Sequence, residues 1–269
     1  MSIKLVAIDL DGTLLNDHHE INQPVVDCIK EARKQGVYVV LSTGRPLSGT
    51  KAQLETLGLN QLDDYIITYN GALVLNTNTW EIIAEHGLTR ENYLEIDHLA
   101  RLLDVHLHVA DKEAMYTANR DISPYTILES YLVNLPLHYR TPEEIAKEVL
   151  PTKMMMIDDP ELLSEAFKKI PAEFFEKYTI VRSTPFFIEV LNPNTSKGLA
   201  LKELSEHLGI QQSEVMAIGD AENDLSMIEF AGTGVAMGNA SETIKAAADY
   251  TVATNLEDGV KEAFENWVL

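Results

Sequence analysis

Short apolar segments that alternate with helical patterns are the feature that most restricts the fold of this chain. In the first third, the strand-like segments Ile3–Ile8, Val37–Leu41 and Tyr65–Thr68 are separated by helical patterns. The last third repeats the alternation around Val215–Ile218 and Gly234–Met237. Strands that are apolar on both sides must be covered on both faces, so this alternation predicts a parallel sheet between two layers of helices.

The middle of the chain follows a different pattern. Leu73–Leu75 and Ile82–Ile83 flank an Asn-Thr-Asn-Thr turn, which is typical of a hairpin. Further along, helical and strand-like segments mix in an α+β pattern, and Phe186–Leu191 is expected to return to the first sheet. We therefore predict an α/β fold in two parts, a Rossmann-like parallel-sheet core of residues 1–83 and 188–269 and an inserted α+β domain of residues 84–187.

The charge balance of the chain excludes some classes of partner. The 269 residues include 21 Lys and Arg against 42 Asp and Glu, which gives a formal net charge of −21. Nucleic acids and anionic membranes both require a basic face, so we expect neither as a partner. An acidic protein of this kind suits the binding of divalent cations instead. The oligomeric state is left open, with a homodimer as one option.

Cysteine usage and hydropathy indicate the compartment. The chain has one cysteine, Cys28, which excludes an internal disulfide and fits a reducing environment. Cys28 lies in a predicted helix, where a small buried hydrophobe is favoured over a reactive thiol. No segment reaches the roughly 20 apolar residues that a membrane-spanning helix needs. We therefore expect a cytoplasmic protein.

Three polar clusters follow predicted strands of the parallel sheet. The carboxyl ends of parallel strands meet at one edge, which is where open α/β sheets bind ligands, so the clusters should converge there. Lys197 sits early in the predicted helix that precedes the third cluster, where it could supply a cation to the same place. The three clusters are Asp9-Leu10-Asp11-Gly12-Thr13, Ser42-Thr43-Gly44-Arg45, and Gly219-Asp220 with Glu222-Asn223-Asp224.

Charge balance connects these clusters to a metal and a phosphate. Asp9, Asp11 and Asp220 contribute about −3 when ionised, which Mg²⁺ and Lys197 together balance. Without those cations the acidic surroundings would repel a phosphate. With them, the strand end at Thr43 and the helix after it provide a hydroxyl and backbone amides for the phosphate oxygens.

The order and spacing of the clusters resemble the four motifs of the haloacid-dehalogenase (HAD) superfamily of phosphatases. The large insert between the second and third motifs resembles the Cof-type subfamily, and the segments Ile67–Ala72 and Asn255–Val260 are also similar to that group. The whole length is similar to YidA-type sugar phosphatases. The resemblance implies a HAD-like core whose inserted domain is a C2-type cap, which closes over the sheet edge and contacts the leaving group.

The resemblance also implies a mechanism. Asp9 would be the nucleophile that forms an aspartyl-phosphate, and Asp11 would serve as general acid and then as general base. Mg²⁺ would be held by Asp9, the backbone carbonyl of Asp11 and Asp220. Asp224 would orient Lys197 or metal-bound water. The phosphate oxygens would be bound by the amides near Leu10 and Gly44, together with Thr43, Lys197 and Asn223.

Several alternatives remain open at this stage. Sugar phosphates are the substrates that the resemblance favours, but nucleotide, flavin or pyridoxal phosphates and a phosphomutase reaction fit the same motifs. A phospho-aspartate signalling domain is a rival of another class. Arg45 fits a phosphate contact or a structural ion pair, and Asn70 fits a turn residue or a substrate contact. His106 and His108 face one side of a strand, where structural histidines are favoured over a metal pair.

Overall fold

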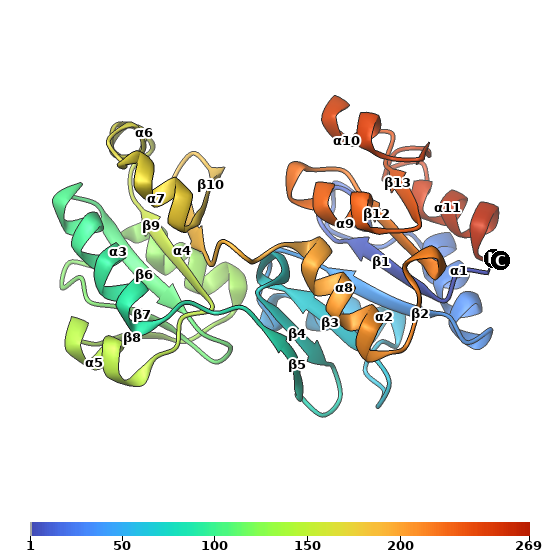
Figure 1. The fold of residues 1–269 in the computed structure, drawn as a ribbon, viewed down its shortest axis with the longest axis horizontal. Coiled ribbons are helices and arrows are strands. Elements are labelled where there is room, and N and C mark those ends of the chain that lie inside the picture. The colour runs from blue at the N-terminus through green and yellow to red at the C-terminus, as the bar shows by residue number, and fades with distance from the viewer. Residues whose placement is uncertain (1) are drawn as a thin grey trace. The chain divides into compact units, whose positions relative to one another are not determined.

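The computed structural model describes residues 2–269, which form two compact units (Figure 1). We call Met1–Ala84 together with Ser196–Leu269 the core unit, and Glu85–Thr195 the inserted unit. The α/β core with an inserted α+β unit, as predicted, is confirmed by the two separate sheets. Among the described residues, none of the helices has both the length and the apolar character needed to cross a membrane.

The core unit is built on an eight-stranded sheet with the order β14-β13-β12-β1-β2-β3-β4-β5. The strands from β14 to β3 are parallel, and β4 pairs antiparallel with β3. Strand β5 lies next to β4, so the two segments of the predicted hairpin are neighbours in the sheet. Strand β1 therefore lies between β12 and β2. The strands are β1 Leu5–Asp9, β2 Tyr38–Ser42, β3 Tyr65–Thr68, β4 Leu73–Asn76, β5 Ile82–Glu85, β12 Val215–Gly219, β13 Thr233–Ala236 and β14 Tyr250–Thr251.

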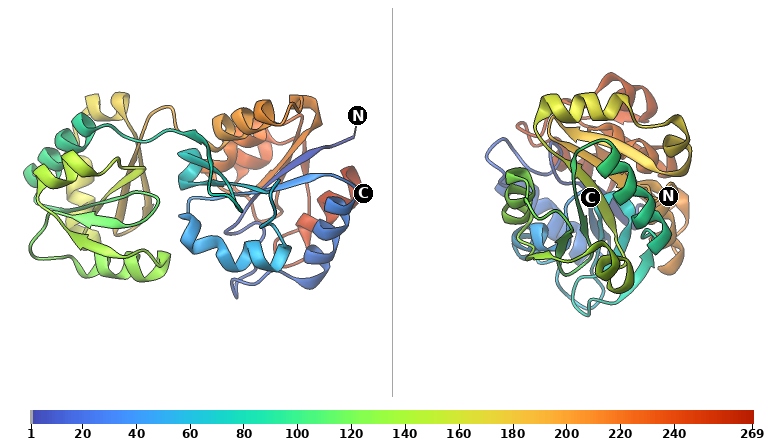
Figure 2. Two further views of the ribbon diagram at one scale, coloured as in Figure 1. Left: turned by 90° about the horizontal axis from the view of Figure 1, so that it is seen from below. Right: turned by 90° about the vertical axis from the view of Figure 1, so that its left-hand side faces the viewer.

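Helices cover both faces of this sheet, as the first panel of Figure 2 shows. Leu5 and Ala7 of β1 pack in one cluster with Leu201 and Leu204 of α8, and the alternate residues of β1 are equally buried. This double burial is the reason that the strands read as continuous apolar runs. The helices are α1 Gln23–Lys34, α2 Lys51–Leu57, α8 Lys197–His207, α9 Leu225–Phe230, α10 Glu242–Ala247 and α11 Gly259–Trp267, with short 3₁₀ turns at Leu47–Thr50, Tyr69–Gly71, Gln212–Glu214 and Glu222–Asp224.

Helix α1 illustrates how local sequence sets these elements. A proline stands in its first turn, and its apolar residues recur on one face, which is buried. Cys28 lies on that buried side and its thiol donates to the carbonyl of Val25 at 3.1 Å. Burial raises the pKa of the Cys28 thiol to about 12, and the expected buried position of Cys28 is confirmed.

The inserted unit has its own six-stranded sheet with the order β10-β11-β9-β6-β7-β8. Neighbouring strands pair antiparallel except β7 with β8. The strands are β6 His106–Ala110, β7 Met115–Thr117, β8 Leu137–Tyr139, β9 Lys153–Ile157, β10 Thr179–Thr184 and β11 Phe187–Leu191. The helices are α3 Arg90–Leu102, α4 Pro124–Val133, α5 Pro142–Glu148, α6 Pro160–Lys168 and α7 Ala172–Lys177.

Strand β11 corrects one expectation. The segment Phe186–Leu191 was expected to return to the first sheet, and this is wrong, because β11 pairs antiparallel with both β9 and β10 of the inserted unit. The chain crosses back into the core unit only between Thr195 and Ser196. A fully buried strand such as β11 carries no alternation that could show which sheet it joins.

The hydrophobic core of the inserted unit uses the methionine run of β9. Met154 and Met156 pack on one face of the sheet with Ile188 and Val190, and Met155 lies on the other face with Phe187. The period of two along a strand explains this division. The run is thus core packing, as the sequence predicted.

Candidate active site

The candidate site lies where three neighbouring strands of the core sheet end. Asp9 closes β1, Thr43 follows β2, and Asp220 follows β12. Because β12, β1 and β2 are adjacent and parallel, with Asp9 opposite Ser42 and Ile8 opposite Ile218, the three residues reach the same edge. The structure therefore brings together three clusters that are spread over more than 200 positions of the sequence.

Lys197 occupies the centre of this group. It begins helix α8, whose Ser196 side chain caps the helix by accepting from the amide of Leu199 at 3.1 Å. The Lys197 side chain is fully buried, and its Nζ lies 2.5 Å from Oδ1 of Asp9 and 2.6 Å from Oδ1 of Asp224. Burial lowers the pKa of Lys197, but the two carboxylates outweigh it and raise the pKa overall. Lys197 is therefore a permanent cation at this site.

The buried carboxylates resist ionisation together. Burial raises the pKa of Asp9 to about 8, which Lys197 opposes and the charges of Asp224 and Asp220 reinforce. Burial also raises the pKa of Asp220 to about 6, although a hydrogen bond from Thr13 acts against it. Burial in a low dielectric is the main cause of both pKa shifts, and the neighbouring carboxylates add to it. An additional cation among these oxygens would relieve the repulsion.

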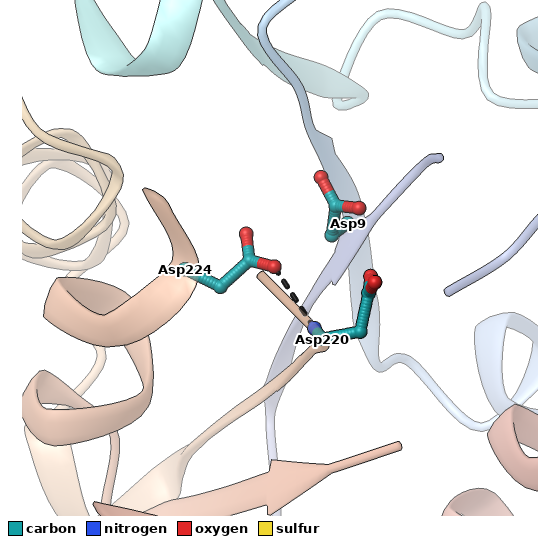
Figure 3. Close-up of side chains that lie close together, drawn as sticks. All are labelled: Asp9, Asp220 and Asp224. Atoms are coloured by element: carbon teal, nitrogen blue, oxygen red, sulfur yellow. Dashed lines mark hydrogen bonds between the residues drawn. The ribbon is translucent and has the colours of Figure 1, made fainter. Parts of the chain in front are cut away.

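The oxygens themselves are arranged to hold such a cation. Asp9, Asp220 and Asp224 each offer a carboxylate oxygen, and these three lie within 4.8 Å of one another (Figure 3). With Lys197, the three carboxylates leave a net charge of about −2, which one divalent ion balances. Hard divalent cations prefer oxygen donors of this kind. Among the described residues, no second group of three His, Cys, Asp or Glu side chains is gathered in this way.

The three carboxylates differ in what else they bind. Both oxygens of Asp224 are occupied, Oδ1 by Lys197 and Oδ2 by the amides of Asp220 at 2.9 Å and Ala221 at 3.1 Å. The Asp220 contact is the dashed line in Figure 3. Asp220 accepts at Oδ1 from Thr13 at 2.7 Å, and its Oδ2 faces Gly12. Asp9 and Asp220 thus keep an open oxygen, whereas Asp224 fixes Lys197 and the loop after β12.

Gly12 keeps space open beside Asp220. Its φ is +87°, and a Cβ there would lie 2.5 Å from Oδ2 of Asp220. Any larger residue would both strain the backbone and fill the space next to the carboxylate. The glycine of the first cluster is therefore required by the geometry of the site.

Asp11 stands apart from the buried group. Its side chain is 49% exposed, and both of its oxygens are held by the Arg45 guanidinium, with Nε 2.8 Å from Oδ2 and Nη2 on Oδ1. Arg45 also donates to the carbonyl of Gly49 at 3.3 Å. Arg45 thus forms the ion pair that the sequence left as one of two alternatives.

The remaining expected phosphate-binding positions line the same edge. Leu10 follows β1 with its side chain fully buried, and Gly44 follows Thr43. The Thr43 hydroxyl is buried and accepts from the amide of Arg45 at 3.1 Å, so its own proton is available to an acceptor. Asn223 is exposed and donates from Nδ2 to Oδ1 of Asn70 at 2.9 Å.

Other residues support the loop after β1 and were not predicted to do so. Asn239 donates to the carbonyl of Gly12 and Asn255 to that of Leu15, each at 2.8 Å. Thr13 was noted only as part of the first cluster, yet it anchors Asp220. Asn255 lies in a segment that the sequence had marked as similar to the Cof-type group, whereas no spacing signal pointed to Asn239.

His106 and His108 of β6 each make a polar contact within the inserted unit. Nδ1 of His106 lies 2.6 Å from Asp158, and Nδ1 of His108 lies 3.4 Å from the hydroxyl of Thr126. Neither belongs to a cluster of metal-ligating side chains among residues 2–269. These contacts agree with the structural role that the sequence favoured.

Comparison with known proteins places the chain in a family. Residues 6–264 match the family described as haloacid dehalogenase-like hydrolase. A Streptococcus pyogenes serotype M6 protein with a provisional phosphatase name is 50% identical over 270 residues, 100% of each chain. The Bacillus subtilis 5-amino-6-(5-phospho-D-ribitylamino)uracil phosphatase YcsE is 35% identical over 269 residues, which cover 100% of this chain and 97% of YcsE.

Solved structures give the same answer. A haloacid dehalogenase-like hydrolase from Bacteroides thetaiotaomicron is 34% identical with a TM-score of 0.86, over 98% of this chain and 99% of that one. The HAD subclass IIB sugar phosphatase BT4131 is 28% identical with a TM-score of 0.79, over 98% of each chain. The core sheet with its inserted second sheet matches these structures. The chain therefore belongs to the haloacid dehalogenase-like hydrolases, as a Cof-like phosphatase of subclass IIB.

Proposed function

We propose that this phosphatase hydrolyses phosphate monoesters of small sugars, with Mg²⁺ as its metal and Asp9 as its nucleophile. The observation that carries the proposal is the buried Lys197 ammonium between Asp9 and Asp224, with Asp220 beside them. A cation fixed against a nucleophilic carboxylate is what a dianionic phosphate requires in an otherwise acidic protein. The single cysteine supports a reducing compartment, and we assign the reaction to the cytoplasm.

The residues at the sheet edge have separable roles in this proposal. Asp9 attacks phosphorus, so that an Asp9–phosphorus bond forms while the bond to the leaving oxygen breaks. Asp11 gives its proton to that oxygen and then takes one from the water that releases phosphate from Asp9. The ion pair of Asp11 with Arg45 must open first, because the guanidinium occupies both oxygens of the Asp11 carboxylate.

The phosphate and the metal use the remaining groups. Lys197, Thr43, Asn223 and the amides near Leu10 and Gly44 bind the phosphate oxygens. Asp9, Asp220 and the backbone carbonyl of Asp11 would hold Mg²⁺. When bound, Mg²⁺ neutralises charge on the carboxylates and on the transferring group. Asp224 would mainly hold Lys197 and the loop after β12 in place, since its Oδ1 accepts from Lys197 and its Oδ2 accepts from two backbone amides.

Sugar phosphates are proposed first because of the similarity to YidA-type sugar phosphatases and to the sugar phosphatase BT4131. A second candidate is a phosphorylated ribityl-pyrimidine, because YcsE, at 35% identity, is described as a phosphatase of such a compound. In both candidates the phosphate monoester is carried by a short polyhydroxylated carbon chain, and the alcohol of that chain is the leaving group. They differ in the pyrimidine ring, which makes them separable by a substrate panel.

The test is a phosphate-release screen over sugar, ribityl-pyrimidine, nucleotide and cofactor monoesters with Mg²⁺ present. We expect turnover that EDTA stops and Mg²⁺ restores. Asp9→Asn should lower kcat by at least about 100-fold without unfolding the chain, because the nucleophile is lost while size is kept. Asp63→Asn, at an exposed position, is the matched control and should retain wild-type activity.

Three outcomes would count against the proposal. Equal activity of Asp9→Asn and wild type would exclude nucleophilic catalysis by Asp9. Turnover confined to nucleotide or aromatic cofactor esters would reject the sugar assignment. A long-lived phosphorylated wild type without multiple turnover would favour the signalling alternative, because an acid and base at Asp11 should hydrolyse the intermediate.

A further inference from the structure

A short left-handed turn adjoins the candidate site. Tyr69, Asn70 and Gly71 follow β3 and have φ values of 51°, 57° and 96°. Three successive residues in this region are unusual, and the tyrosine in particular is strained there. Asparagine and glycine tolerate the conformation better. Contacts from the surrounding chain must therefore hold the turn in place.

Those contacts come from the Ser42–Arg45 cluster after β2 and from Ser196, which precedes Lys197. The amide of Asn70 donates to the carbonyl of Thr43 at 3.0 Å, and the amide of Tyr69 donates to that of Arg45 at 3.2 Å. On the other side, a Cβ at Gly71 would lie 2.2 Å from the carbonyl oxygen of Ser196. The turn thus lies between the end of β2 and the start of α8, whose first residue is Lys197.

The side chain of Asn70 reaches the third motif segment. Its Oδ1 accepts from Nδ2 of Asn223 at 2.9 Å. It also lies against Gly44, where an added Cβ would be 3.1 Å from Oδ1 of Asn70. Asn70 therefore stands between two of the expected phosphate-binding positions, Gly44 beyond β2 and Asn223 beyond β12.

This contact determines what Asn223 can offer to a phosphate. A side-chain amide carries two N–H protons, and Asn70 accepts one of them, which leaves the second for an incoming oxygen. Asn223 is exposed, so without this partner its side chain would be free to rotate. Holding a donor in place before the ligand arrives removes an entropy cost from binding.

We propose that Asn70 is a positioning residue, which orients the Asn223 amide toward the phosphate group of the substrate. The inference rests on the proposed function, since Asn223 is a phosphate ligand only in that reaction. Asn70 itself needs no contact with the substrate. Its effect should therefore disappear when Asn223 is absent, which distinguishes positioning through Asn223 from direct binding.

The experiment is a double-mutant cycle with Asn70→Gly, Asn223→Ala and the double variant, measured with p-nitrophenyl phosphate and Mg²⁺. Glycine keeps the left-handed backbone and removes only the side chain. We expect each single variant to lose roughly tenfold in kcat/KM, mainly through KM, and the double variant to lie within about threefold of Asn223→Ala. Asn134→Gly, another left-handed asparagine, is the matched control and should leave kcat/KM unchanged.

Binding of inorganic phosphate to the same variants, measured by calorimetry, repeats the cycle without turnover. Additive losses in the double variant, or wild-type phosphate affinity in Asn70→Gly, would overturn the role of Asn70. Absence of hydrolysis by the wild type would reject the proposed reaction, and the phosphate-binding cycle would still decide about Asn70. Thermal unfolding of each variant separates loss of orientation from loss of the fold.

Discussion

At the scale of single residues, Lys197 is the side chain on which both the stability and the charge balance of the site depend most. An ammonium with no exposed surface is tolerated only because Asp9 and Asp224 each lie within hydrogen-bond distance. The contact with Asp9 orients this carboxylate, the proposed nucleophile, and neutralises it in part. Removal of this one side chain should therefore affect both folding and chemistry.

Lys197→Met tests this dual role. Methionine keeps much of the volume but leaves two carboxylates uncompensated in the interior, so we expect a loss of about 3–5 kcal/mol in the free energy of unfolding. Turnover should fall by several orders of magnitude. Chemical denaturation and kcat measure the two effects. Lys202→Met on the same helix is the control, because Lys202 is half-exposed and its pairing with Glu206 is weak, so a change in stability as large as that of Lys197→Met would contradict the argument.

His108 gives the protein a specific weakness in acid. It is almost completely buried, and burial, aided by the charge of Lys153, lowers its pKa to about 3. The unfolded chain then takes up a proton near pH 6.5 that the folded chain refuses, so stability is complete above pH 6.5 and declines as the pH falls toward 3. The slope from this one group approaches about 1.4 kcal/mol per pH unit.

His108→Gln should flatten this part of the pH profile. We expect the difference in unfolding free energy between wild type and variant to shrink between pH 6.5 and pH 4, because glutamine does not titrate. Urea denaturation at half-unit steps of pH measures it. The exposed His98→Gln on α3 is the control. Parallel profiles of wild type and His108→Gln across this range would show that His108 does not set the acid limit.

The sequence predicted those site residues whose position follows from the backbone. Asp9, Thr43 and Asp220 sit at strand ends, and parallel pairing of β12, β1 and β2 alone brings them together. The ion pair between Arg45 and Asp11 depends instead on the conformation of the long Arg45 side chain, which strand pairing does not determine. The contacts of Asn70 with Asn223 and of Asn239 with Gly12 join turns far apart in the chain, and no local pattern encodes them.

At the scale of elements, the left-handed turn Tyr69–Gly71 is held by its fit against α8. Gly71 and Gly36 both have positive φ, but they differ in their surroundings. A Cβ at Gly71 would meet the Ser196 carbonyl at 2.2 Å, whereas Gly36 has nothing within 4 Å of that position. Alanine at Gly36 would therefore add backbone strain alone, whereas alanine at Gly71 would add both backbone strain and a steric clash.

Gly36→Ala should cost about 1 kcal/mol, which is the strain of a left-handed alanine. Gly71→Ala should cost at least roughly twice that, because the Ser196 carbonyl must also move. Denaturant unfolding of both variants gives the comparison. Equal losses would mean that the turn is not confined by α8.

The parallel strands that the sequence predicted for the core sheet begin and end within two residues of β1, β2, β3, β12 and β13, whereas shorter elements were harder to predict. Helix α7 and strands β8 and β14 are short, between two and six residues, and too brief to show a period. Strand β11 was recognised as a strand but expected in the other sheet, because burial on both faces removes the alternation that distinguishes an antiparallel strand. Local sequence thus predicted whether a segment forms a helix or a strand better than it predicted which strands pair with each other.

At the scale of the whole molecule, the formal net charge of −21 opposes the approach of any anionic substrate. The attraction of Lys197 is local, whereas the repulsion acts over the distance that salt permits, about 30 Å at 0.01 M and 10 Å at 0.1 M ionic strength. Screening should therefore weaken the repulsion more than the attraction.

We expect kcat/KM for a dianionic phosphate ester, at saturating Mg²⁺, to rise at least roughly twofold between 10 and 150 mM NaCl. Potassium chloride should give the same increase, because screening does not depend on the identity of the monovalent ion. Initial rates at low substrate concentration measure the effect. A decrease in kcat/KM over this range would show that local attraction dominates the encounter.

The second crossing between the units has a consequence for engineering. Thr195 ends the inserted unit, Ser196 caps α8, and Lys197 is its first residue, so only one residue separates the inserted unit from the buried ammonium. An exchange of the inserted unit for another module must therefore end before Ser196, so that the cap and the first turn of α8 are kept. One residue inserted between Lys197 and the buried Leu201 would rotate the start of α8 by about a quarter of a turn relative to its packed face and take the ammonium away from both carboxylates.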